Sequence, residues 1–106
     1  MDIGVVTLFP EMFAVLEAGG VTARALAKGL LSVHTWNPRD HAVNRHRTVD
    51  DRPYGGGPGM VLQVEPVVGA IRAARQALPD ARVVHLTPQG PTLRQAQVRT
   101  LSLIHI

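Results

Sequence analysis

The segment from residue 45 to residue 60, RHRTVDDRPYGGGPGM, concentrates side chains and backbone that could bind a ligand. Three arginines and a histidine flank two adjacent aspartates, and a single tyrosine leads into three consecutive glycines. The segment has no apolar periodicity, so it is not typical of a core element. A flexible linker would not need charged and aromatic residues between its glycines. The pattern predicts a long loop that presents cations, carboxylates and unhindered backbone to a ligand.

Each part of this loop also has a simpler structural explanation. Arg45, Arg47 and Arg52 could pair with Asp50 and Asp51 on a solvated surface, which would add little stability. The glycines at 55–57 could form only a hairpin or a hinge. We favour a functional loop because all these features fall within one segment, and long loops usually have a function or are disordered.

A second candidate site is the segment 86–90, LTPQG, which follows a predicted strand. In open parallel sheets, ligands bind beyond the carboxyl ends of the strands. Pro88 would fix the backbone of this turn and Gly90 would leave it unhindered, which suits main-chain hydrogen bonds to the edge of a nucleoside. A plain β-turn remains the alternative explanation of these residues.

Several other signatures are missing from the sequence. There is no cysteine, and no pair of histidines has the i, i+4 spacing with a carboxylate that marks a metal site, so we expect none. No G-x-S-x-G motif is present. The run GGGPGM lacks the Lys-Ser/Thr of a phosphate-binding P-loop, which argues against a protein that uses these glycines to hold nucleotide phosphates.

The elements that must position these segments alternate along the chain. Strand patterns lie at 3–9, which we expect to be buried, and at 30–36, 60–64 and 82–86. Helix patterns lie at 10–18, 21–28, 66–78 and 92–101. This alternation predicts an α/β fold with a mostly parallel sheet and flanking helices. The 106 residues form one domain or part of one, and 45% hydrophobic residues are enough for a real core.

Composition restricts the cellular setting. The formal net charge is +3 and the pI is about 10.6, and all but one of the 11 basic residues are arginine. Such a balance is a weak indication of nucleic acid as a partner. The first residues lack the basic and long apolar regions of a signal peptide, and no apolar run approaches the roughly 20 residues of a membrane span. We therefore expect a soluble, cytoplasmic protein without a membrane partner.

Five stretches together resemble one known family. They are LFPEMF (8–13), GVTARALAKGLL (20–31), NPRD (37–40), the loop 45–60 and LTPQG (86–90). In combination they are similar to the N-terminal part of the TrmD family, the bacterial tRNA (guanine-N1)-methyltransferases. The resemblance runs from residue 1 to about residue 100, and the loop is its most specific part.

The resemblance implies a SPOUT-type α/β fold with a C-terminal trefoil knot, a homodimer, and S-adenosyl-L-methionine as methyl donor. The acceptor would be N1 of the guanosine 3′ of the tRNA anticodon, with tRNA rather than DNA as the partner. The family's knot and its general-base aspartate come later than the residues matched here. We therefore expect 1–100 to be the N-terminal part of the methyltransferase domain with the knot missing, no catalytic residue within this chain, and no activity from the chain alone.

The chemistry of the implied reaction assigns roles to the two segments. Guanine N1 carries a proton that a general base must remove, and the base must leave its stack to be reached. The carboxylate of Asp50 could accept from the N1 and N2 edge of guanine, and Tyr54 could stack on a base. The residues expected to bind tRNA or guanine are Arg45, His46, Arg47, Asp50, Arg52, Tyr54, Gly55 and Gly59. The residues expected to line the cofactor pocket are Leu86, Thr87, Pro88, Gln89 and Gly90.

Two further hypotheses belong with this interpretation. The chain could be a stand-alone tRNA-binding module without catalysis, which would bind RNA with a steep salt dependence. The second concerns residues 101–106, LSLIHI, which depart from the family pattern and equal the translation of CTGTCTCTTATACACATC, a transposase adapter used in sequencing libraries. We expect this tail to be non-native, and a natural helix end that docks on the core is the alternative.

Overall fold

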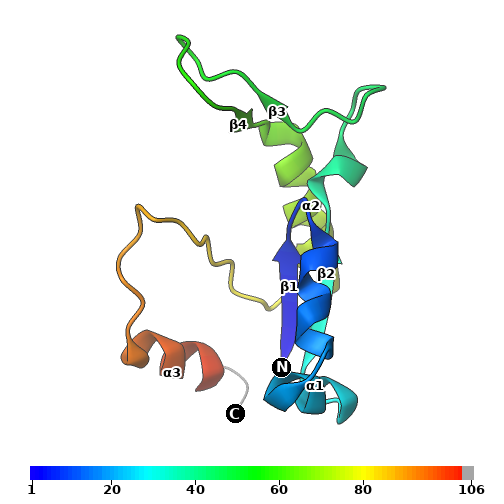
Figure 1. The fold of residues 1–106 in the computed structure, drawn as a ribbon, viewed down its shortest axis with the longest axis vertical. Helices are drawn as coiled ribbons and strands as arrows, with labels where there is room; N and C mark the ends of the chain where they lie inside the picture. The colour runs from blue at the N-terminus through cyan, green and yellow to red at the C-terminus, as the bar shows by residue number, and fades with distance from the viewer. Residues whose placement is uncertain (104–106) are drawn as a thin grey trace.

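A computed structural model of the chain describes residues 1–103, arranged around a parallel pair of strands (Figure 1). Strand β1 (Asp2–Val6) pairs with β2 (Ser32–Trp36), with Ile3 opposite Val33. The connection between them contains the 3-10 helix η1 (Pro10–Glu17) and the helix α1 (Gly20–Ala27). A parallel pair needs such a crossover because the chain must return to the same end of the sheet.

After β2 the chain forms a short 3-10 helix, the loop and two α-helices. The short 3-10 helix η2 (Pro38–His41) is followed by the two-residue antiparallel strands β3 (Asp50–Asp51) and β4 (Val61–Leu62). Helix α2 (Val64–Ala77) packs along η2, β1 and β2. Helix α3 (Gln95–Leu103) lies apart from this body at the end of a long extended segment (Figure 1).

Helices cover both faces of the parallel pair. Val33 and Thr35 of β2 face η1. Trp36 lies on the other face, where its ring and Leu78, just after α2, crowd against Gly4 of β1. This agrees with the strand predicted at 30–36, of which residues 32–36 form β2, and confirms the predicted α/β arrangement of a mostly parallel sheet between helices.

Most of the predicted elements are confirmed, and some change in type or length. The helix predicted at 10–18 is a 3-10 helix, in which Met12 and Ala18 donate to carbonyls three residues earlier at 3.0 and 3.2 Å. Phe9 offers no side-chain cap, and Pro10 has no N–H to donate. The strand predicted at 60–64 shrinks to two residues because α2 begins at Val64. The helix predicted at 92–101 begins three residues later.

The prediction of a strand at 82–86 is wrong. These residues form no strand, and Val83, Val84 and Leu86 expose 56%, 51% and 87% of their surface. A strand needs a neighbour to satisfy its backbone groups, and within residues 1–103 the parallel sheet contains only β1 and β2. The β-branched composition of this run suits a strand, but no strand of the described part of the chain lies beside it.

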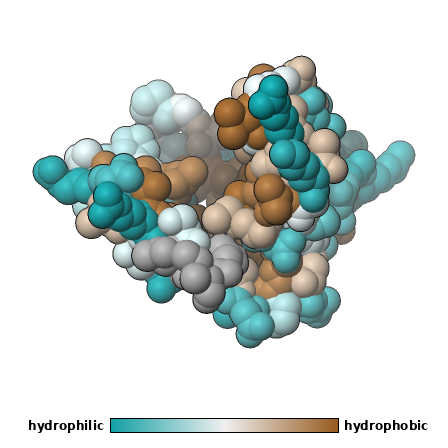
Figure 2. Space-filling view, turned by 90° about the horizontal axis from the view of Figure 1, so that it is seen from below, coloured by the Kyte–Doolittle hydropathy of each residue, from teal (hydrophilic) through white to brown (hydrophobic). Residues whose placement is uncertain are grey.

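The expected large core is also absent from the part of the chain that the structure describes. Only Val49 and Ala70 are buried hydrophobic residues there. The first strand, which we expected to be buried, exposes Ile3 and Val6 by 38% and 36%. Figure 2 shows hydrophobic residues on both sides of a hollow between α3 and the body that carries η1 and α1. The sequence therefore contains the apolar residues of a core, but the described elements do not pack them against one another.

Two remaining expectations concern the membrane and the tail. Within residues 1–103, no helix combines the length and the apolar character required to cross a bilayer. The predicted non-native tail begins inside α3, which continues to Leu103, and its last three residues lie outside the described residues.

Candidate functional site

Residues 37–50, here called the loop base, lead into the exposed part of the loop and are held by hydrogen bonds among themselves. Asn37 begins η2 by accepting from the N–H of Arg39 at 2.9 Å. The guanidinium of Arg39 donates to the carbonyl of Arg47 at 3.1 Å, and that of Arg47 donates back to the carbonyl of Arg39 at 3.3 Å. Arg47 also forms an ion pair with Asp40. These contacts close the segment 39–47 into a compact turn.

The loop base is then anchored on helix α2. The side chain of His41 packs against Gly69, since a Cβ at Gly69 would lie only 2.8 Å from the His41 Cβ. Val49 is 1% exposed, and its carbonyl accepts from the N–H of Gln63 at 2.6 Å, at the residue that precedes α2. Gln63 also donates through Nε2 to the carbonyl of Asp50 at 3.3 Å. The position of Asp50 is thus set by the start of α2.

The tip of the loop, residues 51–60, projects away from the body (Figure 1). Its glycines 55, 56, 57 and 59 have φ values of 82, 90, 111 and 84°, a region that side-chain-bearing residues rarely adopt. No atom of residues 1–103 outside the immediate chain neighbours lies within 4 Å of a Cβ built on any of them. The ring of Tyr54 is fully exposed. The tip therefore offers bare backbone and one aromatic face to solvent.

The predicted cations divide into two groups. Arg45, His46 and Arg52 are exposed, and their side chains form no hydrogen bond or ion pair with any of residues 1–103. Arg47 instead uses its guanidinium within the loop base. The alternative that the arginines pair with Asp50 and Asp51 is wrong, because the one ion pair found among the described residues joins Arg47 to Asp40.

The predicted 86–90 turn is present. Gly90 donates to the carbonyl of Thr87 at 3.1 Å, and the N–H of Gln89 donates to the Thr87 hydroxyl at 3.3 Å. Leu86, Thr87 and Gly90 line an open cavity of about 540 Å³ between this segment and α3, whereas Pro88 and Gln89 are not among its lining residues. The turn and the loop tip lie in different parts of the molecule and are not brought together by the described residues (Figure 1).

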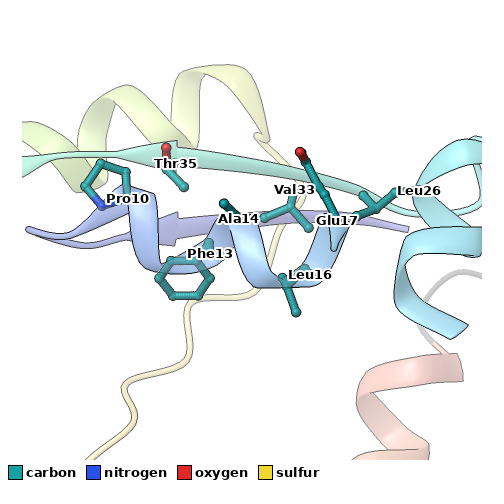
Figure 3. A pocket seen from close by; sticks show the side chains of 8 residues that line it. All are labelled: Pro10, Phe13, Ala14, Leu16, Glu17, Leu26, Val33 and Thr35. Carbon is teal, nitrogen blue, oxygen red and sulfur yellow. The ribbon is translucent and has the colours of Figure 1, made fainter. Parts of the chain in front are cut away.

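The sequence did not indicate a second, smaller cavity. It has a volume of about 210 Å³ and lies between η1, α1 and β2 (Figure 3). Pro10 and Phe13 lie at one end, and Glu17 and Leu26 at the other. Most of its lining residues are of apolar type, with Glu17 and Thr35 as the polar ones.

Sequence reasoning also missed the residues that hold the loop base, namely Arg39, Asp40 and Asn44. Asn44 accepts from Arg47 through its carbonyl at 3.1 Å and from Thr48 through its side chain at 2.8 Å. The stretch NPRD contributed to the family resemblance without a role of its own. An available signal was Asn37 before Pro38, which is typical of a helix start.

Comparison with known proteins agrees with this arrangement of elements. The sequence profile of the family described as "tRNA (Guanine-1)-methyltransferase TrmD" matches residues 1–105. The tRNA (guanine-N(1)-)-methyltransferase of Aliivibrio salmonicida is 57% identical over 103 residues, which are 96% of this chain and 41% of that protein. The enzyme of the same name from Methylococcus capsulatus is 62% identical over 100 residues, 93% of this chain and 40% of that protein.

The fold is matched as well. The crystal structure of tRNA (m1G37) methyltransferase from Aquifex aeolicus superposes with a TM-score of 0.83 at 32% identity, covering 96% of this chain and 46% of that one. The chain spans about two fifths of the length of the curated relatives it matches. These matches cover nearly all of the chain, and on their strength it belongs to the tRNA (guanine-1)-methyltransferase family, TrmD.

Proposed function

We propose that the protein containing this chain transfers a methyl group from S-adenosyl-L-methionine to N1 of the guanosine 3′ of the anticodon in tRNA. Within that protein, the loop of residues 45–60 binds the tRNA and its target guanine, and the 86–90 turn lines the cofactor pocket. The observation that carries the proposal is the loop itself, with a fixed base, an exposed tip, and three exposed cations that have no side-chain partner among residues 1–103.

The loop has the properties that recognition of a flipped nucleotide requires. Arg45, His46 and Arg52 lie exposed with no partner among residues 1–103, so their donors are available to phosphates. Tyr54 presents a free ring on which a base can stack. Gly55 and Gly59, in left-handed conformations, let the backbone approach the nucleotide closely.

Asp50 is proposed to recognise guanine. Its backbone is held by Gln63 at 3.3 Å and by pairing with Leu62, and its carboxylate forms no ion pair within residues 1–103. A carboxylate on such a held backbone can accept from the N1–H and N2–H groups of guanine, an edge that other bases do not share. The general base that removes the N1 proton is proposed to lie outside this chain.

The cofactor supplies an electrophilic methyl group when bound. The cavity beside the 86–90 turn has a volume of about 540 Å³, within the range of about 300–1,000 Å³ usual for ligand sites. Leu86, Thr87 and Gly90 are among the residues that form its wall. We further propose that later residues supply the trefoil knot and the homodimer contact, and that the protein works in the cytoplasm, where its tRNA substrate is found.

A chimera tests the proposal. This chain would replace the matching N-terminal region of the Aliivibrio salmonicida relative, to which it is 57% identical. The expected result is methyl transfer to a tRNA transcript with guanosine 3′ of the anticodon and none to a transcript with adenosine there. The matched control is Asp50→Asn, which keeps the shape but presents an amide to the guanine donors. A folded chimera that binds tRNA but neither binds the cofactor nor methylates would favour the stand-alone binding module.

A further inference from the structure

The guanidinium of Arg47 points back into the loop base and not outward. Its Nε donates to the carbonyl of Arg39 at 3.3 Å, and its Nη2 pairs with the carboxylate of Asp40. Arg39 returns the contact by donating to the carbonyl of Arg47 at 3.1 Å. The charge of Arg47 is thus compensated within the chain, in contrast to that of Arg45 two residues earlier, which has no such partner among the described residues.

The backbone conformation of Arg47 is also unusual. Its φ of 54° is the only positive value at a non-glycine residue within the described part of the chain. An arginine in this conformation is strained, so its surroundings must hold it there. Asn44 does so from the other side, since it accepts from the N–H groups of Arg47 and Thr48 at 3.1 and 2.8 Å. The turn reverses the chain immediately before Val49 and Asp50.

The partner of Arg47 is itself part of a fixed element. Asp40 lies in η2, which is capped by Asn37 and packs on α2 through His41 and Gly69. The ion pair therefore joins the strained turn at 44–47 to a helix whose place is set by α2. On the other side of the turn, Val49 is buried and bonded to Gln63. The direction in which Asp50 and the loop tip leave the body depends on this junction.

We propose that Arg47 and Asp40 are positioning residues, which fix the direction of the loop tip for tRNA without touching the tRNA. This inference rests on the proposed function. It changes the role predicted for Arg47 from direct contact with tRNA to holding the loop in place. The pair is 55% and 63% exposed, and exposed pairs add little to global stability. Its loss should therefore alter the loop and leave the thermal unfolding temperature of the protein nearly unchanged.

A charge exchange tests the proposal in the chimera described above. Arg47→Asp and Asp40→Arg should each raise the KM for tRNA about tenfold, as expected for a lost hydrogen bond to a charged group, with little change in the dissociation constant of the cofactor. The double variant should recover most of the loss, because the ion pair is restored in reverse. A phosphate-contacting Arg47 would behave differently, since the double variant would stay as weak as Arg47→Asp.

Salt dependence supplies an independent measurement. Arg45→Ala should flatten the slope of log affinity against log salt by about 0.7, the value for one phosphate contact on single-stranded RNA, whereas Arg47→Asn should leave this slope unchanged. Asparagine tolerates the left-handed backbone, so this variant removes the ion pair with the least strain. A flattened slope for Arg47→Asn would overturn the proposal.

Hydrogen exchange on the chimera, measured without RNA, separates this inference from the proposed function. The amides of Thr48 and Gln63 should exchange faster in Arg47→Asp and in Asp40→Arg, and near the parental rate in the double variant. This readout needs neither RNA nor methyl transfer. Inactivity of the parental chimera would therefore count against the proposed function alone, and unchanged exchange in the single variants would refute the positioning role.

Discussion

Replacement of Gly69 by alanine tests whether the contact between α2 and η2 sets the loop base. Gly69 lies inside α2, and a Cβ built there would be 2.8 Å from the His41 Cβ and 3.1 Å from its Cγ. Both atoms are close to the backbone of η2, so a simple rotation of the His41 side chain cannot remove the Cβ clash. Relief requires η2 to move away from α2, which shifts the residues that hold the loop.

The two effects of this substitution have opposite signs. Alanine in place of glycine favours a helix by about 1 kcal/mol, while overpacking of a close contact costs about 1–3 kcal/mol. We expect the clash to prevail, with a net loss of about 1 kcal/mol. In a protein of 150–250 residues this lowers the unfolding temperature by about 2–4 °C.

Thermal unfolding of the chimera and its affinity for tRNA measure both consequences. The affinity for tRNA should fall together with stability, because the loop base is displaced. His41→Gly removes the atoms that collide, so Gly69→Ala should be tolerated in that background, and the double-mutant cycle gives the coupling. An increase of about 1 kcal/mol in the free energy of unfolding from Gly69→Ala alone would mean that helix propensity dominates. The inference that η2 packs closely on α2 at this residue would then be wrong.

Four further predictions concern the two sites and the tail. Arg52→Ala in the chimera should reduce methyl transfer strongly, by about 1.5–3 kcal/mol in transition-state stabilisation, with the cofactor dissociation constant unchanged. An equal fall in cofactor affinity would refute the assignment of this loop to tRNA binding. Gly57→Ala should weaken tRNA binding by about 1–3 kcal/mol through its φ of 111° without lowering the unfolding temperature, and normal binding would show that the conformation of the tip is not used. Pro88→Leu should weaken cofactor binding by loosening a preorganised turn, whereas an unchanged dissociation constant in a folded protein would leave a plain β-turn. Sequencing the source locus should show a reading frame that departs from LSLIHI after residue 100, and a genuine stop codon directly after residue 106 would refute the non-native tail.

The sequence was most informative where local chemistry decides the structure. Apolar spacing placed α2 within two residues of its observed bounds, and the glycines after Tyr54 correctly indicated an open loop tip. Both features depend on residues close in the chain, namely helical periodicity and the freedom of glycine at positive φ. The 86–90 turn was predictable for the same reason, since a threonine hydroxyl and Gly90 close it locally.

The failures arose where distant partners decide the structure. The run at 82–86 has a strand composition, but a strand forms only beside another, and no local pattern reveals that residues 1–103 place no strand next to it. Arg47 was predicted to bind tRNA together with its cationic neighbours, which stays a prediction, but the sequence did not indicate its contacts within the loop base. Its true environment comes from Arg39 and Asp40, which the turn at 44–47 brings back to it. The contributions of individual loop and turn residues to tRNA and cofactor binding stay predictions.

Helix α2 connects the loop base to the parallel pair of strands. Its 14 residues span about 21 Å. At its start it holds the loop base through Gln63 and Gly69, and just after its end Leu78 lies against Gly4 of the parallel pair before the chain runs on to the 86–90 turn. A helix resists bending, so a displacement of its first turn is carried to its last. RNA that displaces the loop base would thus be felt where Leu78 packs on the parallel pair. Any effect of RNA on cofactor affinity that arises in this way must be matched by an equal effect of cofactor on RNA affinity.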